Sequence, residues 1–164
     1  MNTPNVIPVE PEVKVGLSFL VSQVGAYAAN TFSDLLRTID LTPQHVGILR
    51  ILASKPHELT QTALANRLSV LPSRLVALLD EIEARGLLER KPNEEDRRSK
   101  VLRITKKGEK TFLRAEMITR TLETQLFSTL SETERAKLSA TMKKLADNLG
   151  LAPGVHPAYR NHNQ

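Results

Sequence analysis

One interruption in an otherwise helical pattern limits most strongly what this chain can fold into. Apolar residues recur every three or four positions over residues 13–39 and in five later segments, which is the spacing of one helix face. The pattern changes only at residues 87–91 and 100–104, two short segments of β character on either side of a polar run. The sequence therefore predicts a mainly α fold with one small β-hairpin, whose long tip is charged.

Residues that start helices precede the later helical segments. A hydroxyl side chain can accept a hydrogen bond from the first helical turn, and proline fits the first position of a helix. These start signals are Thr42 with Pro43, Thr60, Pro72, Thr105, and Ser131 with Glu134 as a capping box. The short helix after Thr60 should turn Ala63, Leu64 and Leu68 inward, and the long helix after Thr105 should reach about residue 130.

Composition excludes several classes of protein. Of the 164 residues, 40% are hydrophobic, which is enough to bury the core of one domain-sized unit. No run of about 18 or more apolar residues would span a membrane, and residues 1–12 do not resemble a secretory signal. Cysteine is absent, which excludes disulfides, thiolate metal sites and thiol-based redox sensing. We therefore expect a cytoplasmic protein with no membrane partner.

The sequence contains no clear motif for catalysis or metal binding. The sequence has no evident nucleophile–base pairing, glycine-rich phosphate loop or His-Glu-x-x-His, so we expect neither an enzyme nor a cofactor. The histidines are scattered without the spacing of metal ligands. The acidic run at residues 94–96 could bind a cation, but no further ligands accompany it. We therefore expect no metal site.

The net charge is concentrated in one stretch. The chain carries 23 Lys and Arg against 18 Asp and Glu, a formal net charge of +5. Between Arg85 and Lys110 there are ten basic and five acidic residues, so this stretch accounts for the whole excess. A basic patch of this kind is typical of a protein that binds a polyanion, although the same residues could form a solvated surface.

The order of two helices and a hairpin is that of a winged helix-turn-helix domain. In the helix predicted after Pro72, an apolar stripe would sit on the domain and leave the opposite face for the major groove of DNA. The outward positions near its start are Ser73, Arg74 and Ala77. Arg74 could reach a guanine edge or a phosphate, Ser73 suits a phosphate or a base, and Ala77 allows close approach. The alternative is an exposed helix face with an ordinary surface arginine.

The hairpin tip carries a second group of candidate DNA-binding residues. Three cations, Arg97, Arg98 and Lys100, follow Asp96. An arginine on such a projecting loop can enter a narrow minor groove, where the negative potential is deepest. Asp96 could hold one of these arginines in place. Alternatively, the acidic residues 94–96 simply neutralise the arginines on a solvated loop.

The hairpin region resembles the wing of MarR-type transcriptional regulators. The family signature is Asp-x-Arg, followed five residues later by Leu or Ile, Thr, two variable positions and Gly. Here it reads DRRSKVLRITKKG over residues 96–108. Further matches are LTPQ at residues 41–44 and LLDEIEARGLLER at residues 78–90. The resemblance covers residues 13–149, nearly the whole chain.

The resemblance implies a domain organisation and a partner. Residues 13–40 and 106–150 would form a helical dimerisation domain, and residues 41–105 the winged helix-turn-helix DNA-binding domain, with tails at 1–12 and 151–164. Such regulators are homodimers that bind pseudo-palindromic sites on double-stranded DNA and usually repress. Independently, the first and last helices are rich in apolar residues, which a self-complementary two-fold interface would cover.

The resemblance also implies roles for single residues of the DNA-binding domain. The minor-groove arginine would be Arg98, oriented by Asp96, with contacts to the DNA backbone from Arg97 and Lys100. The residues at positions 73 and 74 would read the major groove.

A small-molecule ligand is a further implication. Family members are often released from DNA by small phenolic or aromatic compounds, bound where the dimerisation helices meet the winged domain. The residues that could line such a crevice are Tyr27, His45 and Phe112, each of which could equally be an ordinary core or surface residue.

A protein-binding function stays open as the alternative from another class. In that case the basic wing would dock an acidic protein partner. DNA reading would instead show a steep loss of affinity with salt and a strong preference for one sequence.

Overall fold

The chain forms a mainly helical structure with three short strands. The computed structural model describes residues 15–54, 59–93, 99–151, 155–156 and 159. The helices are α1 (Leu17–Arg37), α2 (Pro43–Ala53), α3 (Gln61–Leu68), α4 (Pro72–Ala84), α5 (Lys106–Leu126) and α6 (Glu132–Asn148). The strands are β1 (Leu59–Thr60), β2 (Leu88–Pro92) and β3 (Lys100–Ile104). None of the helices described is long and apolar enough to cross a membrane.

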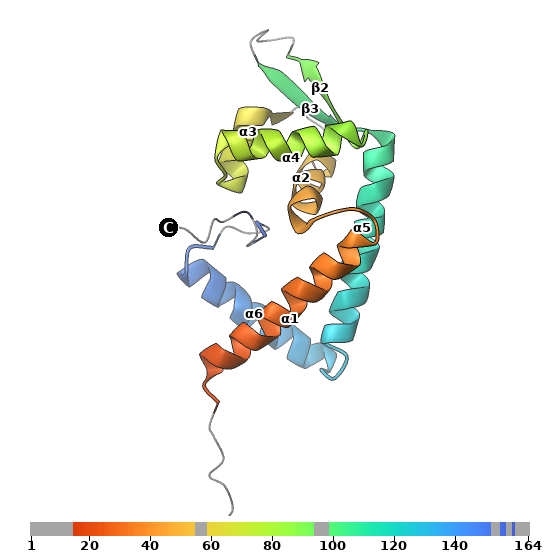
Figure 1. Cartoon of the computed structure of the whole chain (residues 1–164). Coiled ribbons are helices and arrows are strands. Elements are labelled where there is room, and N and C mark those ends of the chain that lie inside the picture. The colour runs from red at the N-terminus through yellow and green to blue at the C-terminus, as the bar shows by residue number, and fades with distance from the viewer. Residues whose placement is uncertain (1–14, 55–58, 94–98, 152–154, 157–158, 160–164) are drawn as a thin grey trace, which may run out of the picture.

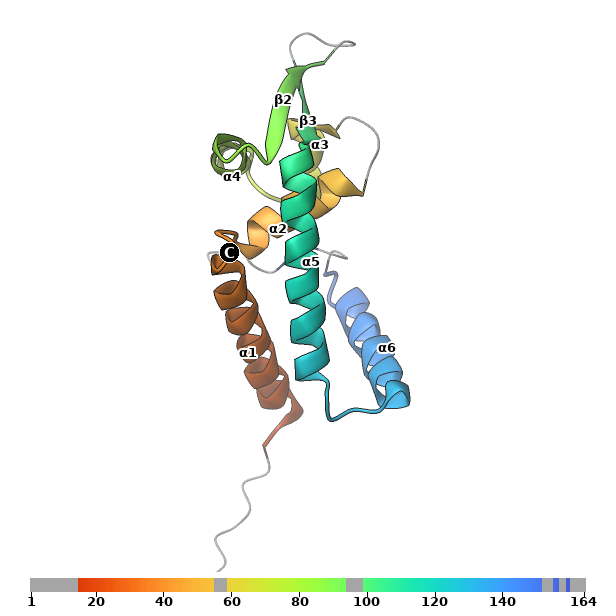
Figure 2. The same ribbon diagram turned by 90° about the vertical axis from the view of Figure 1, so that its right-hand side faces the viewer.

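The elements divide into an upper and a lower part (Figure 1). Helices α2, α3 and α4 lie with the strands in the upper part, and α1 and α6 lie in the lower part. Helix α5 runs from the base of the hairpin of β2 and β3, here called the wing, down to the start of α6 (Figure 2). It therefore links the two parts.

The predicted hairpin belongs to a three-stranded antiparallel sheet with the order β1-β3-β2. Strands β2 and β3 pair from Leu88 opposite Ile104 to Pro92 opposite Lys100, which confirms the predicted hairpin. Strand β1 pairs with the other edge of β3, at residues 101 and 102. The sequence did not predict β1, because an alternating pattern cannot be seen in two residues.

The hydrophobic core lies mainly in the upper part. Helices α2, α3 and α4 contribute fully buried leucines, among them Leu49, Leu64 and Leu79. Leu36 near the end of α1 and Ala115 in the middle of α5 join the same cluster. The core therefore reaches down to the point where the two parts meet.

The lower helices bury far less. Helices α1 and α5 pack against each other, yet Leu36 is the one residue of α1 that is buried. Helix α6 contains no buried residue. Within the residues that the structure describes, the apolar stripe of α6 is therefore left largely uncovered.

The predicted start signals hold. The threonines before α2, α3 and α5 accept hydrogen bonds from the backbone N–H three residues further on, at 3.3, 3.2 and 3.0 Å. Ser131 and Glu134 form the predicted capping box, in which the backbone N–H of Ser131 donates to the Glu134 carboxylate at 2.8 Å. These local contacts set where the helices begin.

Three details go beyond the prediction or differ from it. Helix α5 ends at Leu126 rather than near residue 130, because Ser131 caps α6 from an extended conformation and the chain must turn before it. In α3 the inward position belongs to Ala65 and not to Ala63, since two flanking leucines set the buried face. The segment over residues 151–164, expected to be a tail, includes Tyr159, which is 2% exposed and belongs to the core cluster.

Candidate nucleic-acid interface

Helix α4 presents two chemically different faces. Its buried stripe consists of Leu75, Leu78, Leu79 and Ile82. On the opposite side Ser73 and Ala77 are exposed and Arg74 is partly exposed. Pro72 occupies the first turn, and Leu71 before it supplies no side-chain cap. The three residues predicted to face DNA therefore lie on the open side of a helix that the core holds from behind.

The wing projects next to this helix. Lys100 opens β3 opposite Pro92 and is exposed. Below the tip, the backbone N–H of Asn93 donates to the carbonyl of Ser99 at 3.1 Å, and the side chains of the same two residues bond at 3.0 Å. Asp96, Arg97 and Arg98 lie outside the described residues. The described part of the wing thus ends at the hydrogen bonds between Asn93 and Ser99. Lys100, one of the predicted cations, lies next to them.

Arg90 ties the wing to α4. Its guanidinium lies 2.6 Å from a carboxylate oxygen of Asp80 and 3.3 Å from one of Glu83, and its side chain is 14% exposed. The backbone N–H of Arg90 also donates to Glu83 at 3.1 Å. Because one strand residue holds two turns of α4, the wing and the helix keep a fixed relative position. The contact was not predicted from the sequence, where its signal was a pair of acids three residues apart on one helix face.

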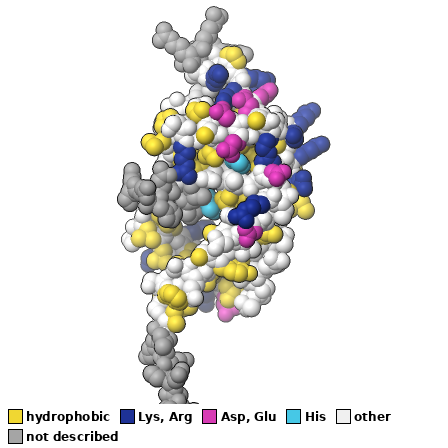
Figure 3. Space-filling view, in the orientation of Figure 1, with side chains coloured by type: hydrophobic (Ala, Val, Ile, Leu, Met, Phe, Trp, Pro, Cys, Tyr) yellow, Lys and Arg dark blue, Asp and Glu magenta, His cyan; other side chains and the backbone are white. Residues whose placement is uncertain are grey.

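An open hollow of about 400 Å³ joins the start of α3, the side of α4 and the wing. Its lining includes the hydroxyls of Thr60 and Thr62, the cation of Lys100, and Arg90, whose guanidinium is already paired with Asp80 and Glu83. Hydroxyl groups and cations are the side-chain groups that commonly bind phosphate oxygens of a nucleic-acid backbone. On the face drawn in Figure 3, Lys and Arg are more numerous in its upper half, with Asp and Glu among them.

Comparison with known proteins identifies the family. The sequence pattern of the MarR family matches residues 39–99, from the turn between α1 and α2 to the wing. The fold is similar to that of a transcriptional repressor, CouR, bound to a 23-mer DNA duplex. The TM-score is 0.71 and the sequences are 30% identical, over 80% of this chain and 92% of that one. This chain belongs to the MarR family.

Other members agree with this assignment. A protein of Thauera aromatica named as the transcriptional regulatory protein for the hcr operon is 29% identical over 133 residues, which are 80% of this chain and 78% of the relative. A mutant MarR from E. coli complexed with operator DNA has a TM-score of 0.67 and 25% identity, over 79% of this chain and 92% of that one. The MarR family consists of DNA-binding transcriptional regulators and not of enzymes. Membership therefore favours the DNA-binding hypothesis over the protein-docking alternative.

The three residues predicted to line a ligand crevice of this MarR-family chain have different surroundings. Tyr27 lies on α1 and is 64% exposed. Phe112 lies on α5, partly buried against the core, and His45 lies on α2 and is 5% exposed. His45 and Phe112 thus face the core, whereas Tyr27 faces outward.

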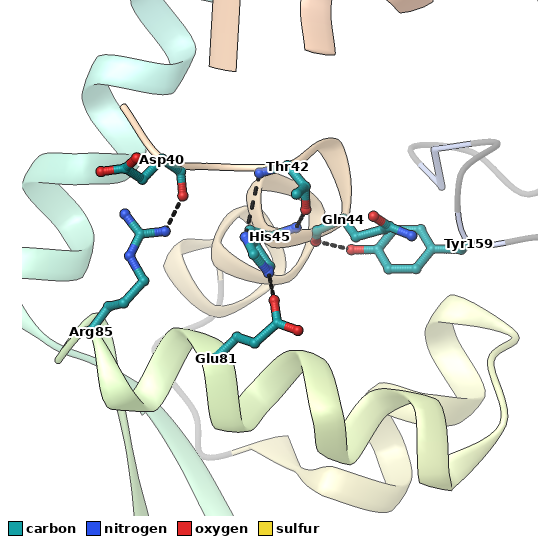
Figure 4. Close-up of polar contacts among 7 residues, drawn as sticks. All are labelled: Asp40, Thr42, Gln44, His45, Glu81, Arg85 and Tyr159. Carbon is teal, nitrogen blue, oxygen red and sulfur yellow. Dashed lines mark hydrogen bonds and ion pairs between the residues drawn. The ribbon is translucent and has the colours of Figure 1, made fainter. Parts of the chain in front are cut away.

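His45 is held at both ring nitrogens (Figure 4). Its Nδ1 accepts a hydrogen bond from the backbone N–H of Thr42 at 3.3 Å, so the proton is on Nε2, which donates to Glu81 on α4 at 3.0 Å. Burial lowers the pKa of His45 below its ordinary value, against the opposing effect of Glu81. His45 therefore acts as a neutral link from the start of α2 to α4.

Arg85 makes a second link at the same junction. At the end of α4 its guanidinium donates to the backbone carbonyl of Asp40 (Figure 4). It also donates to the carbonyl of Ile39 at 3.2 Å. These carbonyls lie in the turn between α1 and α2. The helix with the proposed DNA-reading face is thereby joined to the place where the upper and lower parts meet. The pairing was not visible in the sequence, because Arg85 and Asp40 are 45 positions apart.

Proposed function

We propose that this chain acts as a homodimer that represses transcription from a pseudo-palindromic operator and is released by a small aromatic ligand. The observation that carries the proposal is the unpartnered apolar surface of the lower helices. A second copy of the chain would cover such a surface, because a two-fold interface uses one patch on both subunits.

The lower helices support dimer formation in detail. Exposed hydrophobic residues follow one another along α1, including Leu17, Leu20 and Val24, at 74%, 45% and 57% exposure. In α6, Met142 and Leu145 are 42% and 45% exposed. A groove of about 710 Å³ lies between α1, α5 and α6. Apolar side chains of this number are rarely left in water, so they support the proposed interface.

We propose DNA contacts on the exposed face of α4 and on the wing. We assign Ser73, Arg74 and Ala77 to the major groove and Lys100 to the phosphate backbone. The wing signature assigns Arg98 to the minor groove, oriented by Asp96, and Arg97 to the backbone. Two copies related by a two-fold axis would present two such sets, which is the geometry that reads a palindrome.

Selection of duplexes from a random-sequence pool tests the operator hypothesis directly. The purified protein should enrich a two-fold symmetric site, and sedimentation should give the mass of two chains. A dimer that enriches no sequence would contradict operator recognition. A monomer at micromolar concentration would contradict the homodimer.

The role of the wing is tested by Arg98→Ala. Loss of a minor-groove arginine should weaken operator binding about ten- to hundredfold and leave the dimer intact. Lys143→Ala removes one positive charge from the far side of α6 and serves as the control. Equal operator affinity of Arg98→Ala and the control would rule out the minor-groove role.

Repression and release are tested together with a reporter gene under the selected operator. The protein should lower expression, as expected for a family that includes a transcriptional repressor. Simple phenols should restore expression by lowering affinity for DNA. Substitution of Tyr27, His45 or Phe112 should weaken that response if these residues line the ligand crevice.

A further inference from the structure

Tyr159 is buried at the junction of the upper and lower parts, although it comes from the end of the chain. Its side chain is 2% exposed, and its hydroxyl donates to the backbone carbonyl of Gln44 in the first turn of α2 (Figure 4). The two residues are 115 positions apart. The first turn of helix α2 therefore holds the phenol ring of Tyr159.

The ring lies against a glycine of α2. A Cβ atom at Gly47 would lie 2.5 Å from the hydroxyl oxygen of Tyr159 and 2.9 Å from its Cε2 atom. Any side chain there would collide with the ring. Gly47 and the carbonyl of Gln44 together form a phenol slot, which we define as the surface of α2 in contact with Tyr159.

Neighbouring residues extend this contact to α1. The His156 ring lies 6.0 Å from the ring of Phe32 on α1, and Val155 packs against the core. The backbone N–H of Tyr159 donates to the carbonyl of His156 at 3.1 Å. Val155, His156 and Tyr159, here called the C-terminal anchor, thus contact both the dimerisation helix α1 and the winged part.

The slot selects a neutral phenol. A carbonyl oxygen accepts a hydrogen bond from a hydroxyl group but repels a phenolate, and burial favours the uncharged form. Burial raises the pKa of Tyr159, against the opposing effects of the Ile48 backbone and Arg50. A phenol with a short apolar group para to the hydroxyl has the same shape as the side chain that Tyr159 places in the slot.

We propose that Tyr159 is an intramolecular ligand, and that its slot on α2 binds free para-alkyl phenols when the C-terminal anchor leaves. This inference rests on the proposed release by aromatic compounds and specifies one site for them. A phenol and the C-terminal anchor cannot occupy the slot together. Binding of a free phenol therefore releases the anchor from α2 and α1.

The test uses p-cresol, which is the tyrosine side chain without its backbone, and the full-length chain. Tyr159→Ala empties the slot, so it should bind p-cresol at least about tenfold more tightly than the wild type, in which the anchor must first leave. Toluene should bind the variant about three- to tenfold more weakly than p-cresol, because it cannot donate to Gln44. Calorimetry or ligand-observed NMR measures these affinities.

The double variant Tyr159→Ala, Gly47→Ala is the matched control. Its added methyl group lies where the phenol would sit, so the gain in p-cresol affinity should disappear. Equal p-cresol affinity in wild type and Tyr159→Ala, or equal affinity in the single and double variants, would overturn the proposal. If circular dichroism finds Tyr159→Ala unfolded, Tyr159→Phe is used in its place. This variant loses only the hydroxyl that bonds Gln44, so its anchor competes less well and p-cresol should bind about three- to tenfold more tightly than to the wild type. An unchanged p-cresol affinity would overturn the proposed slot.

DNA binding is measured separately, so the two proposals can fail independently. If phenols lower operator affinity while Tyr159→Ala gains no p-cresol affinity, ligand release stands and the slot is refuted. If the variant gains p-cresol affinity while operator binding ignores phenols, the slot stands and release through it is refuted.

Discussion

The upper and lower parts of the molecule are held together in different ways. In the upper part, side chains such as Leu49, Leu64 and Leu79 are fully buried within one protomer. In the lower part, α6 buries no residue and α1 buries one. Since burial of apolar surface is the main stabilising contribution to a fold, the winged part has a complete core and the lower helices do not.

Polar contacts follow the same division. In the upper part Arg90 joins a strand to α4, and His45 joins α2 to Glu81 on α4 across 36 positions, so both contacts link different elements. In α6 the capping box of Ser131 and the bond from Thr141 to the Lys137 carbonyl stay within a turn. The upper part therefore specifies its own tertiary structure, whereas the described residues of the lower helices leave apolar side chains exposed, as expected if the proposed dimer forms.

Substitution in the core should give the largest effect. Leu79→Ala removes a fully buried side chain of α4 and should lower the free energy of unfolding by about 2–5 kcal/mol at any protein concentration. Leu113→Ala, on an exposed position of α5, is the control and should change stability little. Denaturant unfolding at several protein concentrations measures both. A change below about 1 kcal/mol for Leu79→Ala would refute a complete upper core.

Substitution on the lower apolar face should act on assembly instead. Leu145→Glu places a charge on the apolar stripe of α6 and should weaken the dimer about a hundredfold or more, because a buried charge without a partner is costly. Ala136→Glu adds the same charge on the opposite side of α6. Sedimentation measures the dimer dissociation constant. Similar behaviour of the two variants would mean that this stripe is not the interface.

Sequence reasoning succeeded where the determining contacts are local. The capping threonines and the Ser131–Glu134 box were recognisable because donor and acceptor lie three residues apart. The hairpin was recognisable because its two strands lie close together in sequence. The outward face of α4 followed from the spacing of its apolar residues.

Contacts between positions that are far apart in the chain could not be predicted from the sequence. Strand β1 exists only through its pairing with β3, some forty residues later along the chain, and Glu81 meets His45 from 36 positions away. The C-terminal segment has no apolar period, so its buried Tyr159 could not be foreseen. Gly47, a glycine within a predicted helix, was the available hint, since such a residue often marks a close approach.

Loss of one base contact in the upper part should change which DNA sequence is preferred, whereas loss of the dimer should lower the affinity for all sequences. Arg74→Ala should relax the preference at one base position in each half-site by about 1–3 kcal/mol. Lys100→Ala, at a proposed backbone contact, should weaken all sequences about equally, as should any variant that splits the dimer. Repeating the selection with each variant distinguishes the patterns. Uniform weakening by Arg74→Ala would make it a phosphate contact.

The smallest expected effect concerns the seam between the two parts. The pKa of His45 is lowered by burial, so the unfolded chain binds this proton more readily, and stability should fall as pH drops below about 6.5. The slope should not exceed about 1.4 kcal/mol per pH unit for this group. Protonated Nδ1 cannot accept from Thr42, which opens the cap of α2.

His45→Gln separates titration from structure. Glutamine at this position retains a capping box with Thr42 but carries no titratable proton. The variant should therefore lose less stability than the wild type between pH 7.5 and 5.5, measured by denaturant unfolding. Part of the slope should remain, because burial and Arg50 also lower the pKa of His156, which packs on α1. An identical slope in both proteins would mean that the link between α2 and α4 does not depend on the charge of His45.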